Sequence, residues 1–406
     1  MRIKRLTLGA LAAACATLSA QQLLSGPDGK AIPIFSDVAI LDEDTPRKDL
    51  PCTVTPVKPE LGFDFRFSSG YRVNIPLKEL SDEEGRLTMV FRVTPTDHPG
   101  DPVYLSQHVP VPEIDADAKG DAELGGAFSV GEGKYHVSWL MRGRTERVCS
   151  SSWDIEASLP ARDKPMPLDI APDAVLDANL PAFRPEPRPA GAAAQTGLRL
   201  RVLMNYAPQD TSAAVMAPND SGALLAILRT MSRDPRAASF SLVVFNAQEQ
   251  RIVYRQDEAA RLDLPAMGRA LRSLKLGRVD AKLMAEKHSE AEFLGSLFIQ
   301  EIAGNPEPPD AVIIAGPKAA LEDSLPAGAQ KQLGDVKIPV FYLNCNFDPT
   351  VNPWRDAISG AVRAMRGVEY TIAKPRDVYF AWSDIASHIV KSKVGTSDAL
   401  SAAPKP

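Results

Sequence analysis

Residues 310–317, DAVIIAGP, indicate the fold of the second half of the chain. The centre of this run is continuously apolar and does not alternate, so we expect a strand that is buried on both faces. Two other runs also predict strands, LRLRVLMNY at 198–206 and PVFYLNCNF at 339–347. Strands of this kind between amphipathic helices are typical of a mainly parallel sheet with both faces covered by helices.

Helical and strand-like segments alternate around this run. SGALLAILRTMSRD at 221–234 and the longer stretch 281–304 predict helices, whereas FSLVVFNAQEQRIVYR at 240–255 predicts one more strand. The order of strand and helix predicts a doubly wound α/β domain over residues 198–391.

The preceding residues, 160–197, are rich in proline and alanine. Proline recurs there too often for a helix or a sheet ladder, so we expect an extended linker between two domains. Before it, residues 50–159 contain short runs with a period of two, such as FDFRF at 63–67 and RLTMVFRV at 86–93. Short, regularly spaced strands predict an antiparallel β-sandwich of the immunoglobulin type.

Residues 1–20 are typical of a signal peptide: a basic start, MRIKR, precedes an apolar run and small residues that end at Ala20. The apolar run is too short to span a bilayer, and no later stretch is long enough, so we expect no transmembrane helix. The chain is therefore predicted to be exported, to the periplasm or beyond. Cys15 leaves a lipid-anchored form open. Residues 392–406 predict a disordered tail.

Charge and composition exclude several classes of protein. The chain has 406 residues and a formal net charge of -5, and it has no long basic stripe, so nucleic acid is not an expected partner. Hydrophobic residues make up 44% and charged residues 24%, which is usual for soluble globular domains and excludes a wholly disordered chain.

Three cysteines follow the predicted signal peptide. Cys52 lies near the start of the predicted sandwich and Cys149 near its end, so these two are the candidate disulfide in an oxidising compartment. Cys345 lies in an apolar strand and is predicted to be a small buried side chain and not a nucleophile.

The segment 198–391 resembles a von Willebrand factor A-type domain in its order of elements and in the patches FSLVVFNAQEQ and DAVIIAGPKA. The whole chain also resembles secreted proteins of acidobacteria, which implies no function. In metal-binding members of the domain family, Asp-x-Ser-x-Ser and Asp-Gly follow two strands and hold a divalent cation. Here residues 205–209 are NYAPQ and the second pair is Ala315-Gly316, so the site is degenerate and we expect no metal.

The loops at the carboxyl ends of parallel strands are where open α/β sheets bind ligands. We call this edge of the predicted sheet the crest. Its candidate ligand-binding residues are polar side chains at or just after predicted strand ends: Asn205, Gln209, Asp210, Asn246, Lys318 and Asn346.

No catalytic motif is present: the sequence has no nucleophile elbow, no phosphate-binding glycine loop and no His-Glu-x-x-His pair. The sequence therefore predicts a non-enzymatic exported protein that contacts a protein or an extracellular polymer and needs no cofactor. Two alternatives stay open. One is a secreted hydrolase whose active site carries no recognisable motif, and the other is a metal-dependent adhesion module with oxygen ligands from outside the lost motif.

Overall fold

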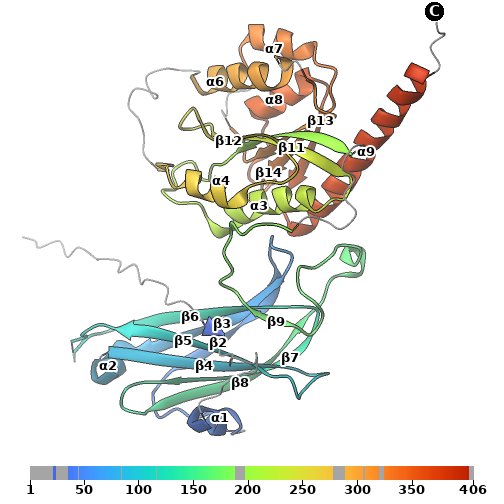
Figure 1. Ribbon diagram of the computed structural model, residues 1–406. Coiled ribbons are helices and arrows are strands. Elements are labelled where there is room, and N and C mark those ends of the chain that lie inside the picture. Colours follow the sequence, from blue (N-terminus) through green and yellow to red (C-terminus); the bar gives the residue numbers. More distant parts are fainter. Residues whose placement is uncertain are drawn as a thin grey trace, which may run out of the picture. The chain divides into compact units, whose positions relative to one another are not determined.

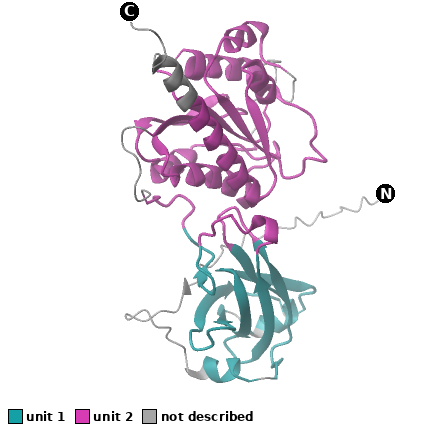
Figure 2. Cartoon of the chain, turned by 90° about the vertical axis from the view of Figure 1, so that its right-hand side faces the viewer, with its two compact units in different colours: residues 1–60, 67–158, 170–180 teal, residues 61–66, 159–169, 181–406 magenta. Residues whose placement is uncertain are grey.

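The computed structural model divides the chain into two compact units, which are coloured separately in Figure 2. Unit 1 comprises residues 1–60, 67–158 and 170–180, and unit 2 comprises residues 61–66, 159–169 and 181–406. The residues whose structure is described are 22–23, 35–43, 45–83, 85–115, 117–187, 197–277, 289–304, 307–319 and 324–401. The predicted signal peptide, residues 1–20, lies outside them.

Unit 1 is built from two sheets (Figure 1). The first has five strands, and each neighbouring pair is antiparallel; in order they are β1 (Gln22–Leu23), β5 (Val103–Val111), β4 (Gly85–Pro95), β7 (Gly133–Arg142) and β8 (Val148–Ala157). The second contains β2 (Thr53–Leu61), β3 (Phe67–Pro76), β6 (Asp121–Val130) and β9 (Val175–Asp177). The short helices are α1 (Phe35–Leu41) and α2 (Leu77–Leu80).

Aromatic side chains join the two sheets of unit 1. Tyr71 of β3 lies 5.1 Å from Trp139 of β7 and 5.6 Å from Phe91 of β4, measured between ring centroids. Phe91 also contacts Phe128 of β6 at 5.7 Å. All four side chains are at most 1% exposed, because the alternation of apolar and polar residues places them on the inner faces. Trp139 is thus a core residue, whereas Trp153 is only partly buried.

A disulfide joins Cys52 and Cys149, the pair that the sequence named as a candidate. Their Cα atoms lie 6.3 Å apart, within the range that a disulfide spans. The backbone before Cys52 also follows β8, since Leu50 N donates a hydrogen bond to Val148 O at 3.0 Å. The disulfide therefore fastens the segment that leads into β2 to the edge of the first sheet.

Unit 2 contains a six-stranded mixed sheet. In order, the strands are β12 (Arg251–Ala259), β11 (Ala237–Asn246), β10 (Leu198–Asn205), β13 (Ala311–Gly316), β14 (Val340–Cys345) and β15 (Val368–Ile372). Neighbouring strands are parallel except for β11 and β12, which form an antiparallel hairpin. The predicted apolar run DAVIIAGP forms β13 in the middle of the sheet, and all six residues of this strand are buried.

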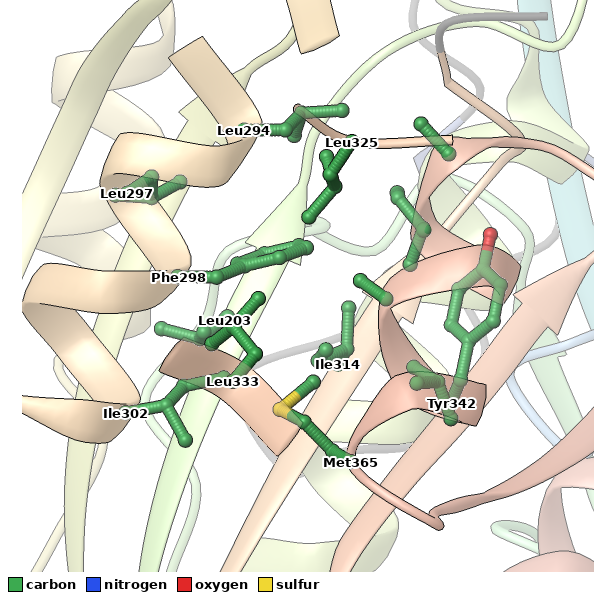
Figure 3. Close-up of a cluster of buried hydrophobic side chains, with 14 of the residues drawn as sticks. Leu203, Leu294, Leu297, Phe298, Ile302, Ile314, Leu325, Leu333, Tyr342 and Met365 are labelled. Atoms are coloured by element: carbon green, nitrogen blue, oxygen red, sulfur yellow. The ribbon is translucent and has the colours of Figure 1, made fainter. Parts of the chain in front are cut away.

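Helices pack on both faces of this sheet (Figure 1). One face is covered by α6 (Ser289–Phe298), the π-helical turn η3 (Ile299–Ala303), α7 (Ala327–Gly334) and α8 (Ala357–Ala364). The other is covered by α3 (Pro218–Ser232) and α9 (Pro375–Ser401), and α4 (Leu264–Leu271) contacts β12. Figure 3 shows the core of the first face, where Leu203 and Ile314 of the sheet meet Phe298, Leu333 and Met365.

The predicted fold class, an immunoglobulin-like sandwich followed by a doubly wound α/β domain, is wrong for this chain. Strands predominate in the described residues, in three sheets, and the sheet of unit 2 is mixed. Residues 240–255 were expected to form one strand and form the β11–β12 hairpin instead. The turn has a local cause: Asn246 Oδ1 accepts a hydrogen bond from Glu249 N at 2.7 Å, and Gln250 has a φ of 49°.

Residues 160–187, which make up most of the described part of the predicted linker, are packed and not free. Strand β9 pairs with β6 in unit 1. Further along, Glu186 accepts hydrogen bonds from Arg229 Nε of α3 at 2.7 Å and from Nε of Arg233, the C-cap of α3, at 2.9 Å. The prolines of this segment did not prevent a short 3-10 helix (Ala161–Asp163), a three-residue strand or an ion-paired segment. Of the predicted disordered tail, residues 392–401 belong to α9, which continues to Ser401, and residues 402–406 lie outside the described residues.

Candidate functional site

The buried amides of the crest connect neighbouring strand ends. Asn205, at the end of β10, donates from Nδ2 to Pro317 O at 3.3 Å and accepts from Ala247 N at 3.1 Å. Asn246, at the end of β11, donates from Nδ2 to Tyr206 O at 2.8 Å. Both asparagines are at most 1% exposed. Their hydrogen bonds are directed to the backbone of adjacent loops, so these two side chains hold the crest together.

Lys318 and Asn346 fasten the loop before α8. Lys318 Nζ donates to Asn352 O at 2.7 Å and to Trp354 O, and it lies 5.8 Å from the centre of the Trp354 ring. Asn346 Nδ2 donates to Asn352 O at 3.0 Å. Two side chains that follow different strands thus bind the same carbonyl oxygen, which fixes the loop.

Gln209 and Asp210 complete the predicted set. Gln209 Oε1 accepts a hydrogen bond from Phe347 N at 3.3 Å. Asp210 is exposed and accepts from the backbone N–H of Ser212 at 2.9 Å and from its hydroxyl at 2.7 Å, and these bonds lower the pKa of Asp210. The structure therefore brings the six candidates to one edge of the sheet and gives each of them a hydrogen-bond partner within the chain; of the six, only Asp210 is exposed.

Burial raises the pKa of two titratable groups at the crest, Cys345 and Asp220. Burial raises the pKa of the Cys345 thiol to about 12, which removes the thiolate that nucleophilic chemistry needs. Burial also raises the pKa of Asp220. Among the described residues, no three His, Cys, Asp or Glu side chains converge as a metal site.

Gly316 makes the close approach of β13 to β10 possible. Its φ is 144°, and a Cβ atom placed there would lie 2.6 Å from Asn205 O. We expect Gly316→Ala to lower the free energy of unfolding by about 1–3 kcal/mol, because backbone atoms have to move. Urea denaturation measures this. Gly328→Ala is the matched control: Gly328 lies in α7 with no atom within 4 Å of the added Cβ, so stability should be unchanged or rise. Equal effects of the two substitutions would contradict the close-approach role.

A pocket of about 690 Å³ lies beside α4, and no sequence motif indicates it. Its walls are Phe183, Tyr206, residues 214–216, and side chains of α4 and the following loop as far as Leu276. The lining is mostly apolar, which is typical of a binding pocket. Val215 lies at the pocket with 72% of its surface exposed, although a large aliphatic side chain is usually buried.

Two glycines shape this pocket. Gly277 has a φ of 67°, and a Cβ atom there would lie 2.7 Å from the Cα of Ala214, so only glycine lets the two loops approach this closely. Gly268 of α4 lies against the ring of Phe183: a Cβ atom added at Gly268 would lie 2.6 Å from Cγ of Phe183. Buried Leu264 and Met267 anchor α4.

Two cations, Arg269 and Arg272, line the pocket, and a third, Lys275, follows them in the chain. Arg269, Arg272 and Lys275 follow one another on α4 and the loop after it, and all three residues are exposed. Within the described part of the chain, none of the three takes part in an ion pair. The nearby Arg251, in contrast, is paired with Glu249 at 2.7 Å. The pocket therefore combines an apolar interior with two arginines that have no ion-pair partner among the described residues.

No protein-family model and no curated protein matches this chain. Among solved structures, a variant of the PilB minor pilin from Streptococcus sanguinis is similar at 8% identity and a TM-score of 0.31, covering 74% of this chain and 87% of the pilin. Bacteroides uniformis β-glucuronidase 2 is similar at 8% identity and a TM-score of 0.19, and the match spans only 38% of that enzyme. Likenesses this low carry no argument about function. The resemblance to von Willebrand factor A-type domains stays a prediction.

Proposed function

We propose that this protein is a non-enzymatic, exported protein whose unit 2 binds a partner protein through the pocket beside α4. The observation that carries the proposal is an open, mostly apolar pocket of about 690 Å³ with the exposed Val215 at its edge. An apolar side chain of a partner would be removed from water on entering such a pocket, and this is the main source of affinity at protein hot spots.

Two observations support export. Residues 1–20 have the pattern of a signal peptide. The Cys52–Cys149 disulfide belongs to an oxidising compartment. No helix in the described parts of the chain has both the length and the apolar character needed to cross a bilayer.

Peptide display tests the binding function. Random dodecapeptides selected on the full chain should share an apolar anchor, and Val215→Asn should weaken the binding of the enriched peptides about tenfold, because an amide replaces an apolar contact at the pocket. Isothermal titration calorimetry with synthetic copies of the peptides measures the change.

Val351→Asn is the matched control, because Val351 is a similarly exposed valine of unit 2, with 62% of its surface exposed, and lies outside the pocket lining. The affinity of this variant for the peptides should equal that of the unchanged chain. A selection that enriches no peptide, or peptides that bind Val215→Asn as tightly as the unchanged chain, would contradict the proposed function.

A further inference from the structure

The positive edge of the pocket contrasts with the charge of the whole chain. The formal net charge of the chain is -5, yet Arg269, Arg272 and Lys275 lie within seven residues and have no ion-pair partner among the described residues. Two arginines of β12, in contrast, are neutralised: Arg251 pairs with Glu249 and Arg255 with Glu301. An unneutralised group of cations on an acidic protein attracts an acidic partner at this place and steers its approach.

Two of these cations, Arg269 and Arg272, are part of the pocket lining. Arg269 and Arg272 are three residues apart, so they lie on the same side of α4 and of its C-terminal cap, and both line the pocket. A guanidinium group binds a carboxylate through two parallel hydrogen bonds. A ligand that fills the apolar interior therefore meets two carboxylate-binding groups at the pocket edge.

We propose, resting on the proposed function, that the pocket binds an acidic peptide segment, with an apolar side chain inside and carboxylates on Arg269 and Arg272. A single-chain fatty acid carries one carboxylate and would leave the second guanidinium without a partner. A bilayer surface requires a face of apolar side chains that project outward, whereas here, apart from the exposed Val215, the apolar surface lines a concave pocket.

Fluorescence anisotropy of two labelled peptides on the full chain tests the proposal. We expect the hexapeptide Glu-Glu-Leu-Phe-Glu-Glu to bind about tenfold more tightly than Gln-Gln-Leu-Phe-Gln-Gln, because only the first offers carboxylates to the arginines. Raising the salt from about 50 to about 300 mM should remove most of this difference, since exposed charges are screened.

The double variant Arg269→Glu, Arg272→Glu should lose the preference for the acidic peptide and bind it about tenfold more weakly. The matched control is Lys331→Glu, Lys337→Glu, which makes the same change in net charge at two exposed lysines of unit 2 outside the pocket lining. This control should bind the acidic peptide as the unchanged chain does.

Three results would overturn the proposal. If the neutral peptide binds as tightly as the acidic one and the arginine variant binds both equally, the acidic specificity is wrong while the binding pocket of the proposed function stands. If the chain binds phosphatidylglycerol vesicles and neither hexapeptide, the partner is a lipid surface. If neither probe binds and the display selection also enriches nothing, the proposed function fails together with this inference.

Discussion

Replacing both Cys52 and Cys149 with serine should lower the free energy of unfolding of unit 1 by about 2–5 kcal/mol. The two cysteines are separated by 97 positions in the sequence, so the disulfide removes much of the freedom of the unfolded chain. It also holds the segment before β2 on β8, where Leu50 is fully buried. Urea denaturation of unit 1 under non-reducing conditions measures the loss.

Reduction provides the control for this experiment. A thiol reductant should destabilise the unchanged chain by a similar amount and should leave the double-serine variant unaffected, because Cys345 is a free, buried cysteine and Cys15 lies in the predicted signal peptide. The account of unit 1 would be wrong if the unchanged chain and the double variant unfolded at the same urea concentration.

Glu186→Ala should destabilise unit 2 by about 3–5 kcal/mol. Glu186 and Arg229 are each only 8% exposed, and the Nε–Oε1 distance between them is 2.7 Å. Alanine would leave the Arg229 guanidinium in its buried position without its carboxylate, and the second arginine of the group, Arg233, would keep only the carboxylate of Asp169. Urea denaturation of unit 2 gives the change.

Glu258→Ala is the control for this substitution. Glu258 is an exposed carboxylate of β12 that accepts one hydrogen bond, from Ser239, and its removal should change stability by no more than about 0.5 kcal/mol. A loss for Glu186→Ala no larger than that of this control would show that the segment after β9 contributes little to unit 2.

The sequence predicted the elements whose pattern is local. The apolar runs at 310–317 and 339–347 contain β13 and β14, and the alternation at 86–93 lies within β4, because burial on one face or both leaves a direct pattern in the residues. The hairpin at 240–255 was missed because its turn has no glycine. It depends on the Asn246 side chain and on Gln250 in a left-handed conformation, which apolar periodicity does not reveal.

The pocket had no comparable local signal. Its walls come from Phe183, from Tyr206 with residues 214–216, and from α4 with its following loop, so they meet only after folding. The crest was predicted from strand ends, and its polar residues do meet there, but sequence could not show that Asn205 and Asn246 bind neighbouring backbone. The residues that could have indicated the pocket from sequence were its two glycines, Gly268 and Gly277, and the nearby cations Arg269, Arg272 and Lys275.

The central claim, that unit 2 binds a protein segment in the pocket beside α4, is tested most directly by methionine-methyl NMR of the full chain. Met216 lines the pocket, whereas Met204 and Met365 are buried elsewhere in unit 2 and serve as references. On titration with the dodecapeptide most enriched by display, the account predicts that the Met216 methyl signal shifts and saturates while both references stay unchanged. A saturable binding event that leaves the Met216 signal in place would contradict it.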